Sequence, residues 1–501
     1  MATGSTASSD TEGRDTPAAD RADVTPLAAD LRAEPRPVAG ADSGAAAGAP
    51  TASSAAPIVD HDASRRAFFR QFGKQAVTAA GQVAGMANIL NRTTSAAAAN
   101  LLGLGEPVST RPQRAGPWTG ASGRAAGTPV TVRPVADDTY RSPYRLVGDE
   151  LMLLDQRGIP GAIDEIVARR GSDVAYYLRL GACRGGPLMA QVAAYGLALT
   201  AGERATYPPR ALEAELRRTS RALTAARPSS RLVGWAMERM QPLSSSLPDD
   251  ATGASVAVAL RTEADGIADH FQAGHAAIVD ALVELLSDPP DRPLGLLLHG
   301  DPGTLSGGLV GTAITALGRL HSEGRRLRVF VTETRPFMDG ARLGGWELRQ
   351  AGIDHKVIPD AAVAWLFERE AIDAVLIGAE WIAANGDTGA VVGSRAIAQQ
   401  AAAVAERPPK VRPRVIVCGV IATIDPATPD GDAIPEELRP ARDLLAYLGD
   451  VPIPASDALV PASDVIPAGA ISALVTERGA LSPPSHEAIA ALLGPVAVEP
   501  L

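Results

Sequence analysis

Short apolar segments alternate with amphipathic segments through the C-terminal part of the chain. The clearest apolar segments are residues 294–298, 327–331, 374–377 and 415–420, and each is bounded by turn residues. Segments of this length and composition are typical of strands that are buried on both faces. Because helical patterns separate them, they predict a parallel, doubly wound, Rossmann-like sheet domain over residues 291–501.

The preceding segment, residues 144–290, has a mainly helical pattern. A short strand pair is predicted around Leu151–Leu154, and apolar residues then recur at helical spacing, most clearly from Thr262 to Leu286. The predicted fold class is therefore α/β, with a mainly helical N-terminal domain in front of the sheet domain. His270 and His275 lie on the long helical segment, but without a nearby carboxylate cluster they predict no metal site.

The chain begins with a segment of low complexity. Residues 1–60 are mostly Ala, Asp, Pro, Ser, Thr and Gly, with almost no large apolar side chains. Such a segment cannot bury enough surface to offset its conformational entropy, so we predict a disordered tail. Residues 103–143 are rich in Gly, Pro, Arg and Thr and are predicted to be a linker.

Residues 61–102 differ from both neighbouring segments. They contain the sequence Ser64-Arg65-Arg66-x-Phe68, which resembles a twin-arginine export signal. Polar residues interrupt the apolar run that follows, which is unusual for a signal peptide. The favoured interpretation is an amphipathic helix over residues 64–90 that docks on the protein body, a partner or a membrane surface. Export or membrane tethering through the two arginines is the alternative.

Composition narrows the classes of function. The formal net charge of −10 provides no global attraction to nucleic acid or to anionic membranes. The two cysteines, Cys183 and Cys418, form neither a disulfide framework nor a zinc motif, which favours a reducing, cytoplasmic location. Arginine supplies nearly all of the positive charge, which suits bidentate phosphate binding better than Schiff-base chemistry. No cofactor is predicted, and no segment is long and apolar enough to span a bilayer.

The stretch Thr332–Ile353 is the strongest candidate for a ligand-binding turn. It begins at the end of an apolar segment, turns through Thr334, Arg335 and Pro336, and continues at helical spacing up to Gly352. Doubly wound proteins bind anions where a strand passes through a polar turn into a helix. On spacing alone, however, the favoured interpretation is an ordinary strand–helix crossover with a solvated arginine.

The same stretch carries a family resemblance. From Glu333 to Leu348 it reads E-T-R-P-x-x-x-G-A-R-L-x-x-W-E-L, which resembles the signature of the S-methyl-5-thioribose-1-phosphate isomerase family. That family is related to the α, β and δ subunits of translation initiation factor 2B. Further motifs similar to those of the family follow in the same order, so the resemblance covers roughly residues 146–495. These motifs lie at residues 153–160, 183–187, 227–240 and 465–479.

The resemblance implies an aldose–ketose isomerisation in which a Cys and an Asp act as acid–base groups in an apolar pocket. Gly300 occupies the position of the Cys, within the segment His299–Thr304. Glu380 occupies the position of the Asp and is one methylene longer. We predict Glu380 as one catalytic group and either Asp301 or Cys183 as the second. The favoured interpretation of these two, however, is that Asp301 caps a turn and Cys183 is a small buried apolar residue.

The resemblance also implies a phosphate site. The predicted substrate-binding residues are Arg184, Gly185, Arg227, Asp339, Gly393 and Ser394. Asp339 stands where many members have Gln, which adds negative charge near a phosphate. Ala390 and Val391 replace the Asn and Lys of the family, so its phosphate-side lysine is missing here.

Two functions are compatible with these residues. The first is a divergent sugar-phosphate isomerase, acting in methionine salvage on methylthioribose 1-phosphate or on a related pentose phosphate. The second is a non-catalytic regulatory protein that binds a sugar phosphate or nucleotide, as initiation factor subunits do. The missing Cys favours the second, whereas the order of the motifs favours a phosphate pocket in both. Family members commonly pair through the sheet domain, so we expect a homodimer.

Overall fold

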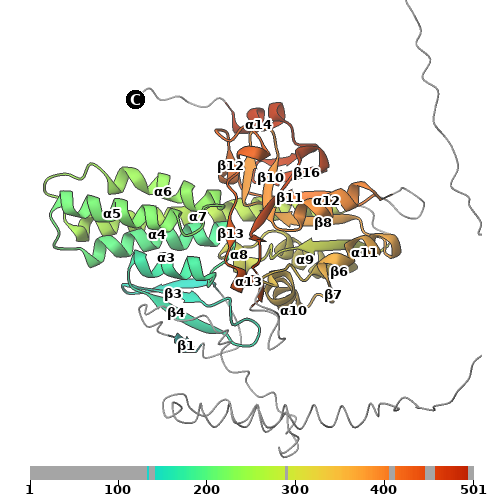
Figure 1. Cartoon of the computed structure of the whole chain (residues 1–501), viewed down its shortest axis with the longest axis horizontal. Coiled ribbons are helices and arrows are strands. Elements are labelled where there is room, and N and C mark those ends of the chain that lie inside the picture. The colour runs from blue at the N-terminus through green and yellow to red at the C-terminus, as the bar shows by residue number, and fades with distance from the viewer. Residues whose placement is uncertain (1–131, 135–141, 288–291, 405–411, 446–456, 495–501) are drawn as a thin grey trace, which may run out of the picture. The chain divides into compact units, whose positions relative to one another are not determined.

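The computed structural model describes residues 132–134, 142–287, 292–404, 412–445 and 457–494 (Figure 1). The predicted tail, the amphipathic segment with its twin-arginine motif and most of the linker lie outside the described residues. The described residues belong to one unit, which contains both the helical and the sheet part of the chain.

A four-stranded antiparallel sheet precedes the helices in the described chain, in the order β1-β4-β3-β2. Strands β2 and β3 pair across a tight turn in which Gly148 adopts a φ of +61°. The strand pair predicted around Leu151–Leu154 is therefore part of a larger sheet, which buries Leu151, Leu153 and Ile166 in the core. The strands are Val132–Pro134 (β1), Tyr144–Val147 (β2), Glu150–Leu154 (β3) and Asp164–Ala168 (β4).

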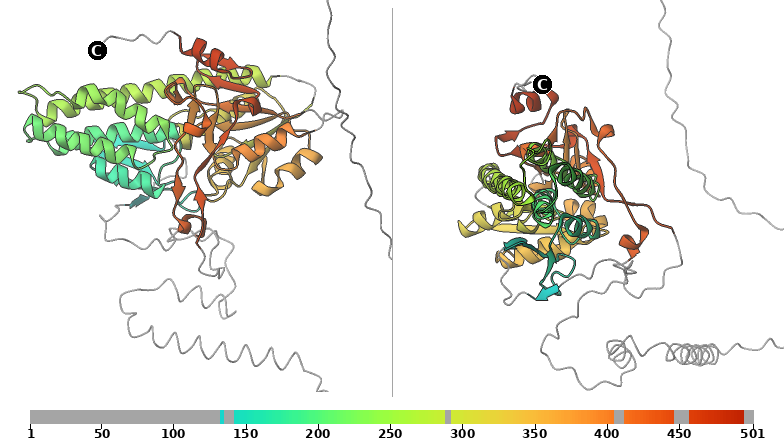
Figure 2. Two further views of the ribbon diagram at one scale, coloured as in Figure 1. Left: turned by 45° about the horizontal axis from the view of Figure 1, so that its top comes forward. Right: turned by 90° about the vertical axis from the view of Figure 1, so that its left-hand side faces the viewer.

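A bundle of long helices follows. Helix α4 lies at its centre and is buried around most of its circumference, as its continuous run of apolar and small residues requires. Helix α7 packs against α4 and begins with a capping box of Thr252 and Ser255, upstream of the predicted start at Thr262. Figure 2 shows the bundle nearly end-on in its right-hand view. The helices are Gly171–Leu180 (α3), Gly186–Glu203 (α4), Pro209–Thr224 (α5), Arg231–Ser244 (α6) and Gly253–Leu286 (α7).

The predicted doubly wound sheet is confirmed. Within the described residues it has seven strands in the order β17-β16-β11-β8-β5-β6-β7, and the pairings are parallel except that of β17 with β16. The apolar segments of the sequence form its central strands. The strands are Leu294–His299 (β5), Leu327–Thr332 (β6), His355–Ile358 (β7), Ala374–Gly378 (β8), Arg414–Cys418 (β11), Ala473–Thr476 (β16) and Gly479–Leu481 (β17).

Helices cover both faces of this sheet. Successive side chains of a strand face opposite sides, so Leu296 and Leu298 join a buried cluster with α7, while Leu297 joins a second cluster with Phe367 and Ile397. The predicted helix after Pro336 is present as a π-helical turn, Gly340–Gly344, continued by α10. The remaining helices are Thr304–Gly307 (α8), Ala313–Ser322 (α9), Gly345–Gln350 (α10), Val363–Arg369 (α11), Ser394–Ala402 (α12), Ala441–Leu445 (α13) and His486–Leu493 (α14).

Short strands complete the fold beside the carboxyl ends of the large sheet. They form a small sheet in the order β12-β9-β10-β15 and a separate pair, β13-β14. Their bounds are Trp381–Ala383 (β9), Thr388–Val391 (β10), Ile424–Asp425 (β12), Leu438–Arg439 (β13), Val460–Pro461 (β14) and Ser463–Ile466 (β15).

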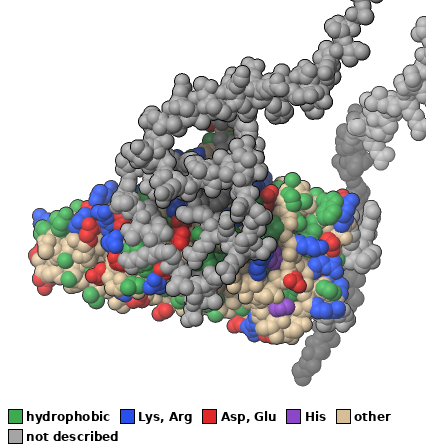
Figure 3. Space-filling model, turned by 90° about the horizontal axis from the view of Figure 1, so that it is seen from below, with side chains coloured by type: hydrophobic (Ala, Val, Ile, Leu, Met, Phe, Trp, Pro, Cys, Tyr) green, Lys and Arg blue, Asp and Glu red, His purple; other side chains and the backbone are tan. Residues whose placement is uncertain are grey.

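Basic and acidic side chains are interspersed over the face of the molecule in Figure 3. Among the described residues, no helix has the length and apolarity that a membrane span requires.

Candidate functional site

The strand order of the large sheet reverses between β5 and β8, which places a crevice at the carboxyl ends of these strands. A cavity of about 130 Å³ lies there. The turns after β5, β6, β8 and β11 line it together with the amino end of α4. Six predicted residues share this lining, namely Arg184, Gly185, Arg227, Asp301, Asp339 and Glu380.

The turn after β5 begins with a buried histidine. The two ring nitrogens of His299 lie 2.7 Å from Thr332 Oγ1 and 3.1 Å from the carbonyl oxygen of Val392, and burial lowers the pKa of the ring. Gly300 follows with a φ of +84°, in the left-handed region. A Cβ atom added to Gly300 would meet Val391 Cγ1 at 3.3 Å. The position implied for a catalytic thiol is thus on the pocket wall, but without a side chain.

Asp301 is the next residue of this turn. Both of its carboxylate oxygens are buried and accept no hydrogen bond from the described residues. Burial raises the pKa of Asp301 well above its usual range, and the nearby carboxylates of Glu347 and Asp339 raise it further. Burial and the neighbouring carboxylates therefore favour the protonated form of Asp301 in the pocket lining.

Glu347 supports this turn from α10, a role that the sequence analysis did not assign. Its carboxylate accepts hydrogen bonds from the amides of Thr304 and Leu305, at 2.8 and 2.6 Å, and from Thr304 Oγ1 at 2.5 Å. Burial raises the pKa of Glu347 to about 7, although these hydrogen bonds oppose the shift. Glu347 thus caps α8 and fixes the turn that carries Asp301. The sequence offered one signal for this role, namely that Glu347 is a charged residue among the apolar positions of a predicted helix.

Glu380 enters the pocket from the turn after β8. Its backbone is held by the hydrogen bonds from its amide to the carbonyl oxygen of Gly389 and from the amide of Arg231 to its own carbonyl oxygen. Its Oε2 is buried and accepts no hydrogen bond from the described residues. Burial raises the pKa of this carboxyl, while the positive charge of Arg227 opposes the shift. Glu380 and Asp301 are therefore two buried carboxyl groups in different electrostatic surroundings.

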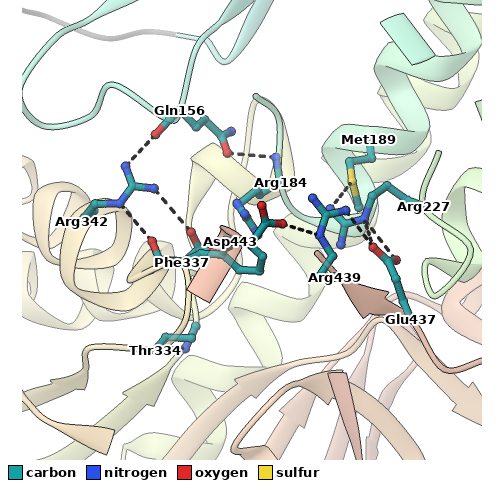
Figure 4. Close-up of polar contacts among 12 residues, drawn as sticks. Gln156, Arg184, Met189, Arg227, Thr334, Phe337, Arg342, Glu437, Arg439 and Asp443 are labelled. Carbon is teal, nitrogen blue, oxygen red and sulfur yellow. Dashed lines mark hydrogen bonds and ion pairs between the residues drawn. The ribbon is translucent and has the colours of Figure 1, made fainter. Parts of the chain in front are cut away.

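Arg184 reaches the pocket just before α4. Its guanidinium lies 3.2 Å from Asp339 Oδ2. It also stacks over the ring of Phe337, with Cζ at 3.6 Å from the ring centre (Figure 4). Its amide donates to Gln156 Oε1 at 2.9 Å. Gly185, with a φ of +90°, then turns the chain into α4. The arginine is thus held by contacts on several sides.

Arg227 also lines the pocket. Its Nε is 3.4 Å from the carboxylate of Glu437, and Nη1 is 3.5 Å from the sulfur of Met189 (Figure 4). Arg439 links Glu437 to Asp443, at 3.1 and 3.0 Å. Burial disfavours the charged form of Glu437, but Arg227, the hydroxyl of Ser229 and Arg439 together outweigh it and lower the pKa of Glu437. Glu437 is thus an anion that neutralises part of the charge of Arg227.

The predicted helix start at Gly393 and Ser394 has a different set of partners. The amides of Gly393 and Arg395 donate to the carboxylate of Asp464, at 2.8 and 3.1 Å, and Ser394 Oγ donates to the carbonyl oxygen of Val391 at 2.6 Å. Gly393 and Ser394 are not among the described residues that line the pocket. Their role in substrate binding stays a prediction, and an internal carboxylate already satisfies this helix end.

The two cysteines differ in their relation to the pocket. Cys183, weighed as a second acid–base group, is fully buried in the core, is not among the described pocket residues, and has a pKa that burial raises to about 12. Cys418 ends β11 beside Gly378 and does line the pocket, also with a pKa raised by burial to about 12. The sequence analysis did not single out Cys418. Its position at the end of a predicted central strand was the available signal.

Replacing Asp301 by Asn is expected to stabilise the protein at neutral pH. Because the pKa of Asp301 is raised in the folded state, the folded protein keeps a proton that the unfolded chain releases above about pH 3.9. The free energy of unfolding therefore falls as pH rises between the two pKa values, and this loss is absent at lower pH. The Tm of Asp301→Asn should therefore exceed that of wild type by an amount that increases as pH rises from 4 to 8, as thermal unfolding at each pH would show.

The matched control is Asp280→Asn, because the Asp280 side chain is 71% exposed. A Tm difference for Asp301→Asn that is independent of pH would contradict this account.

The fold is that of doubly wound proteins, and its pocket lies at the point where the strand order reverses. The sequence model of the initiation factor 2 subunit family matches residues 182–483. This is more than half of the chain, and the chain belongs to this family.

Proteins called methylthioribose-1-phosphate isomerase are among its relatives. One from Nitrosococcus oceani is 36% identical over 348 residues, which cover 69% of this chain and 96% of the relative. One from Chloroflexus aurantiacus is 35% identical over 337 residues, which cover 67% and 94%.

Solved structures share the fold. The crystal structure of 5-methylthioribose 1-phosphate isomerase from Pyrococcus horikoshii OT3 matches with a TM-score of 0.61 and 25% identity, covering 71% of this chain and 96% of that one. Subunit delta of translation initiation factor eIF-2B from A. fulgidus matches with a TM-score of 0.57 and 24% identity, covering 71% and 100%. The predicted family resemblance and α/β fold class are confirmed.

Proposed function

We propose that the pocket catalyses an aldose–ketose isomerisation of a small phosphorylated sugar, with Asp301 and Glu380 as the acid–base pair. The observation that carries this proposal is that both carboxyl groups are buried in the lining of one pocket. Burial raises the pKa of each, toward the range in which proton transfer is efficient at neutral pH. The isomerase relatives provide the substrate class, and methylthioribose 1-phosphate is the first candidate.

The two carboxyl groups take different roles because their surroundings differ. Asp301 faces other carboxylates and is the proton donor, whereas Glu380 faces Arg227 and is the base. Glu380 removes the proton from carbon 2 while Asp301 protonates the ring oxygen, and the bond between that oxygen and carbon 1 breaks. The resulting enol loses its hydroxyl proton and gains a proton at carbon 1, which yields the ketose. No external oxidant or reductant is needed.

The arginines and the amino end of α4 have a binding role in this proposal. Arg184 and Arg227 flank the pocket, and Gly185 and Gly186 bring backbone amides to it. Guanidinium groups and helix amides are the usual partners of phosphate oxygens. These groups would hold the phosphate while the sugar carbons lie between Glu380 and Asp301.

The second candidate is a non-catalytic protein that binds a sugar phosphate or nucleotide. The feature that favours it is Gly300, which leaves the implied thiol position without a side chain. An isomerase assay of the full chain with methylthioribose 1-phosphate, followed by detection of the ketose, separates the two. Turnover is expected. Ligand-induced thermal stabilisation without turnover would support the binding protein instead. The absence of both turnover and stabilisation would contradict both proposals.

We also propose that the protein acts in the cytoplasm as a homodimer. The family relationship supports both statements. Sedimentation analysis of the purified chain would test the dimer.

A further inference from the structure

His275 is a buried histidine of α7 that lines the pocket and takes no part in the proposed proton transfers. Its Nδ1 lies 2.7 Å from the carbonyl oxygen of Val310. A carbonyl oxygen can only accept a hydrogen bond, so Nδ1 carries the proton. Burial lowers the pKa of the ring to about 4, so at neutral pH the ring is uncharged and holds this one proton. Nε2 is therefore a hydrogen-bond acceptor.

The Nε2 atom of His275 is open to a ligand. It has no hydrogen-bond partner among the described residues, yet it is not one of their fully buried, unpartnered polar atoms. It therefore keeps accessible surface, although only 2% of the residue is exposed. Gly307 belongs to the same pocket lining, and a Cβ atom added there would meet His275 Nδ1 at 3.2 Å and Cε1 at 3.3 Å. Without that atom, no side chain at position 307 covers this edge of the ring.

Neighbouring aromatic rings restrict the orientation of His275. The ring centre of Phe271, one turn earlier on α7, lies 6.0 Å from that of His275. Trp235 of α6 packs edge-on against Phe271, with the ring centres 5.5 Å apart. Together with the hydrogen bond to Val310, these contacts fix the direction of Nε2 before a ligand binds. A fixed acceptor loses little conformational entropy on binding, so its contact with a ligand is more favourable.

The other polar groups of the pocket show what this acceptor adds. Arg184 and Arg227 are hydrogen-bond donors and suit the oxygens of a phosphate. Nε2 of His275 carries no hydrogen, so it offers no hydrogen bond to a phosphate oxygen. A sugar hydroxyl, in contrast, can donate to it. The pocket therefore contains donors for the phosphate and a neutral acceptor that suits the sugar.

We propose that His275 is a specificity-determining residue whose Nε2 accepts a hydrogen bond from a ring hydroxyl of the sugar, so that the pocket selects hydroxylated over deoxygenated sugar phosphates. A sugar that lacks this hydroxyl leaves a buried acceptor without a donor, which costs affinity. The inference rests on the proposed function, because it names a contact to the sugar of that same ligand.

The test compares ribose 1-phosphate with its 2-deoxy and 3-deoxy analogues by calorimetric titration of the full chain. Glu380→Gln serves as the common parent, because this change is expected to block turnover during the titration while keeping the fold. The parent should bind ribose 1-phosphate about three- to tenfold more tightly than at least one of the two analogues, as the loss of one hydrogen bond predicts.

Two substitutions in this parent remove the acceptor in different ways. His275→Asn keeps a donor near the position of Nδ1 for Val310 but has no atom at the position of Nε2. His275→Phe keeps a ring that packs against Phe271 but has no nitrogen. Each variant should bind the disfavoured analogue as tightly as ribose 1-phosphate, and the two together guard against a failure of one to fold.

The matched control is His270→Phe in the same parent. His270 also lies on α7 and packs against Phe271, with ring centres 5.7 Å apart, but it is not among the described pocket residues. This variant should keep the preference for ribose 1-phosphate. Loss of the preference in His270→Phe would show that packing of α7 sets it, and would overturn the inference.

Equal binding of the three sugars by the parent would also overturn the inference, as would no binding of ribose 1-phosphate or a preference that persists in the folded His275 variants. The proposed function is judged separately, by turnover of methylthioribose 1-phosphate in wild type. An active wild type with a persisting preference in the His275 variants removes only this contact. An inactive wild type, with a preference that disappears in the His275 variants, removes only the isomerase.

Discussion

Glu380→Gln is expected to lower kcat for sugar-phosphate isomerisation by about 10²–10⁴-fold, the usual contribution of a positioned general base. Glutamine has nearly the same shape, so the pocket is preserved, but it cannot accept the proton from carbon 2. The fold should persist, because burial already disfavours the charged form of Glu380. Glu380→Asp keeps the carboxylate but moves it by about an ångström, which is expected to cost on the order of a hundredfold.

The matched control for this loss is Glu368→Gln, whose side chain is 77% exposed on α11. Steady-state kinetics over a range of pH add a second readout. In wild type, kcat/KM should fall in acid as Glu380 is protonated and in base as Asp301 loses its proton. An enzyme that keeps a tenth or more of its activity after Glu380→Gln does not use this residue as its base.

Gly185→Ala is expected to destabilise the protein by about 2–5 kcal/mol and to abolish ligand binding. The added Cβ would lie 2.3 Å from Ser306 Cβ and 2.4 Å from Ser306 Cα, so a rotamer change cannot relieve the overlap. The φ of +90° at Gly185 adds strain for any residue with a side chain. The amino end of α4 and the α8 turn would have to separate, and this separation breaks the pocket wall.

The control is Gly234→Ala within α6, where the nearest atom to the added Cβ is Arg231 Nη1 at 3.7 Å. This change is expected to raise the free energy of unfolding by up to about 1 kcal/mol, because alanine favours helix. Denaturant unfolding of both variants measures the difference. If Gly185→Ala unfolds at the wild-type midpoint, the contact between α4 and Ser306 does not define the site.

Several site residues could be predicted because they follow local signals. Asp301 and Glu380 come directly after apolar strands, and the carboxyl ends of β5 and β8 meet at the reversal of the strand order. Arg184 stands at the start of a strongly helical segment. Each position could be placed near the crevice from the order of elements alone.

Other features depend on residues that are far apart in the chain. Asp464 satisfies the amide of Gly393 across 71 positions, and Glu347 caps Thr304 across 43. The four-stranded antiparallel sheet β1-β4-β3-β2 was predicted only as a strand pair, because β1 is short and pairs with β4 over a long separation in the chain. Nothing in the local pattern around these residues indicates such partners.

The sequence by itself determined the α/β class, the central strands, the long helices and the family, because hydrophobic periodicity and ordered motifs are properties of the chain read locally. Only the tertiary structure decided the chemistry of the pocket. In the folded protein Arg184 pairs with Asp339, and Glu380 and Cys418 line the pocket, whereas Cys183 is not among the described pocket residues. The physical reason is that side-chain direction, burial and charge pairing arise where separate elements pack together, and the pKa of each group follows from that packing.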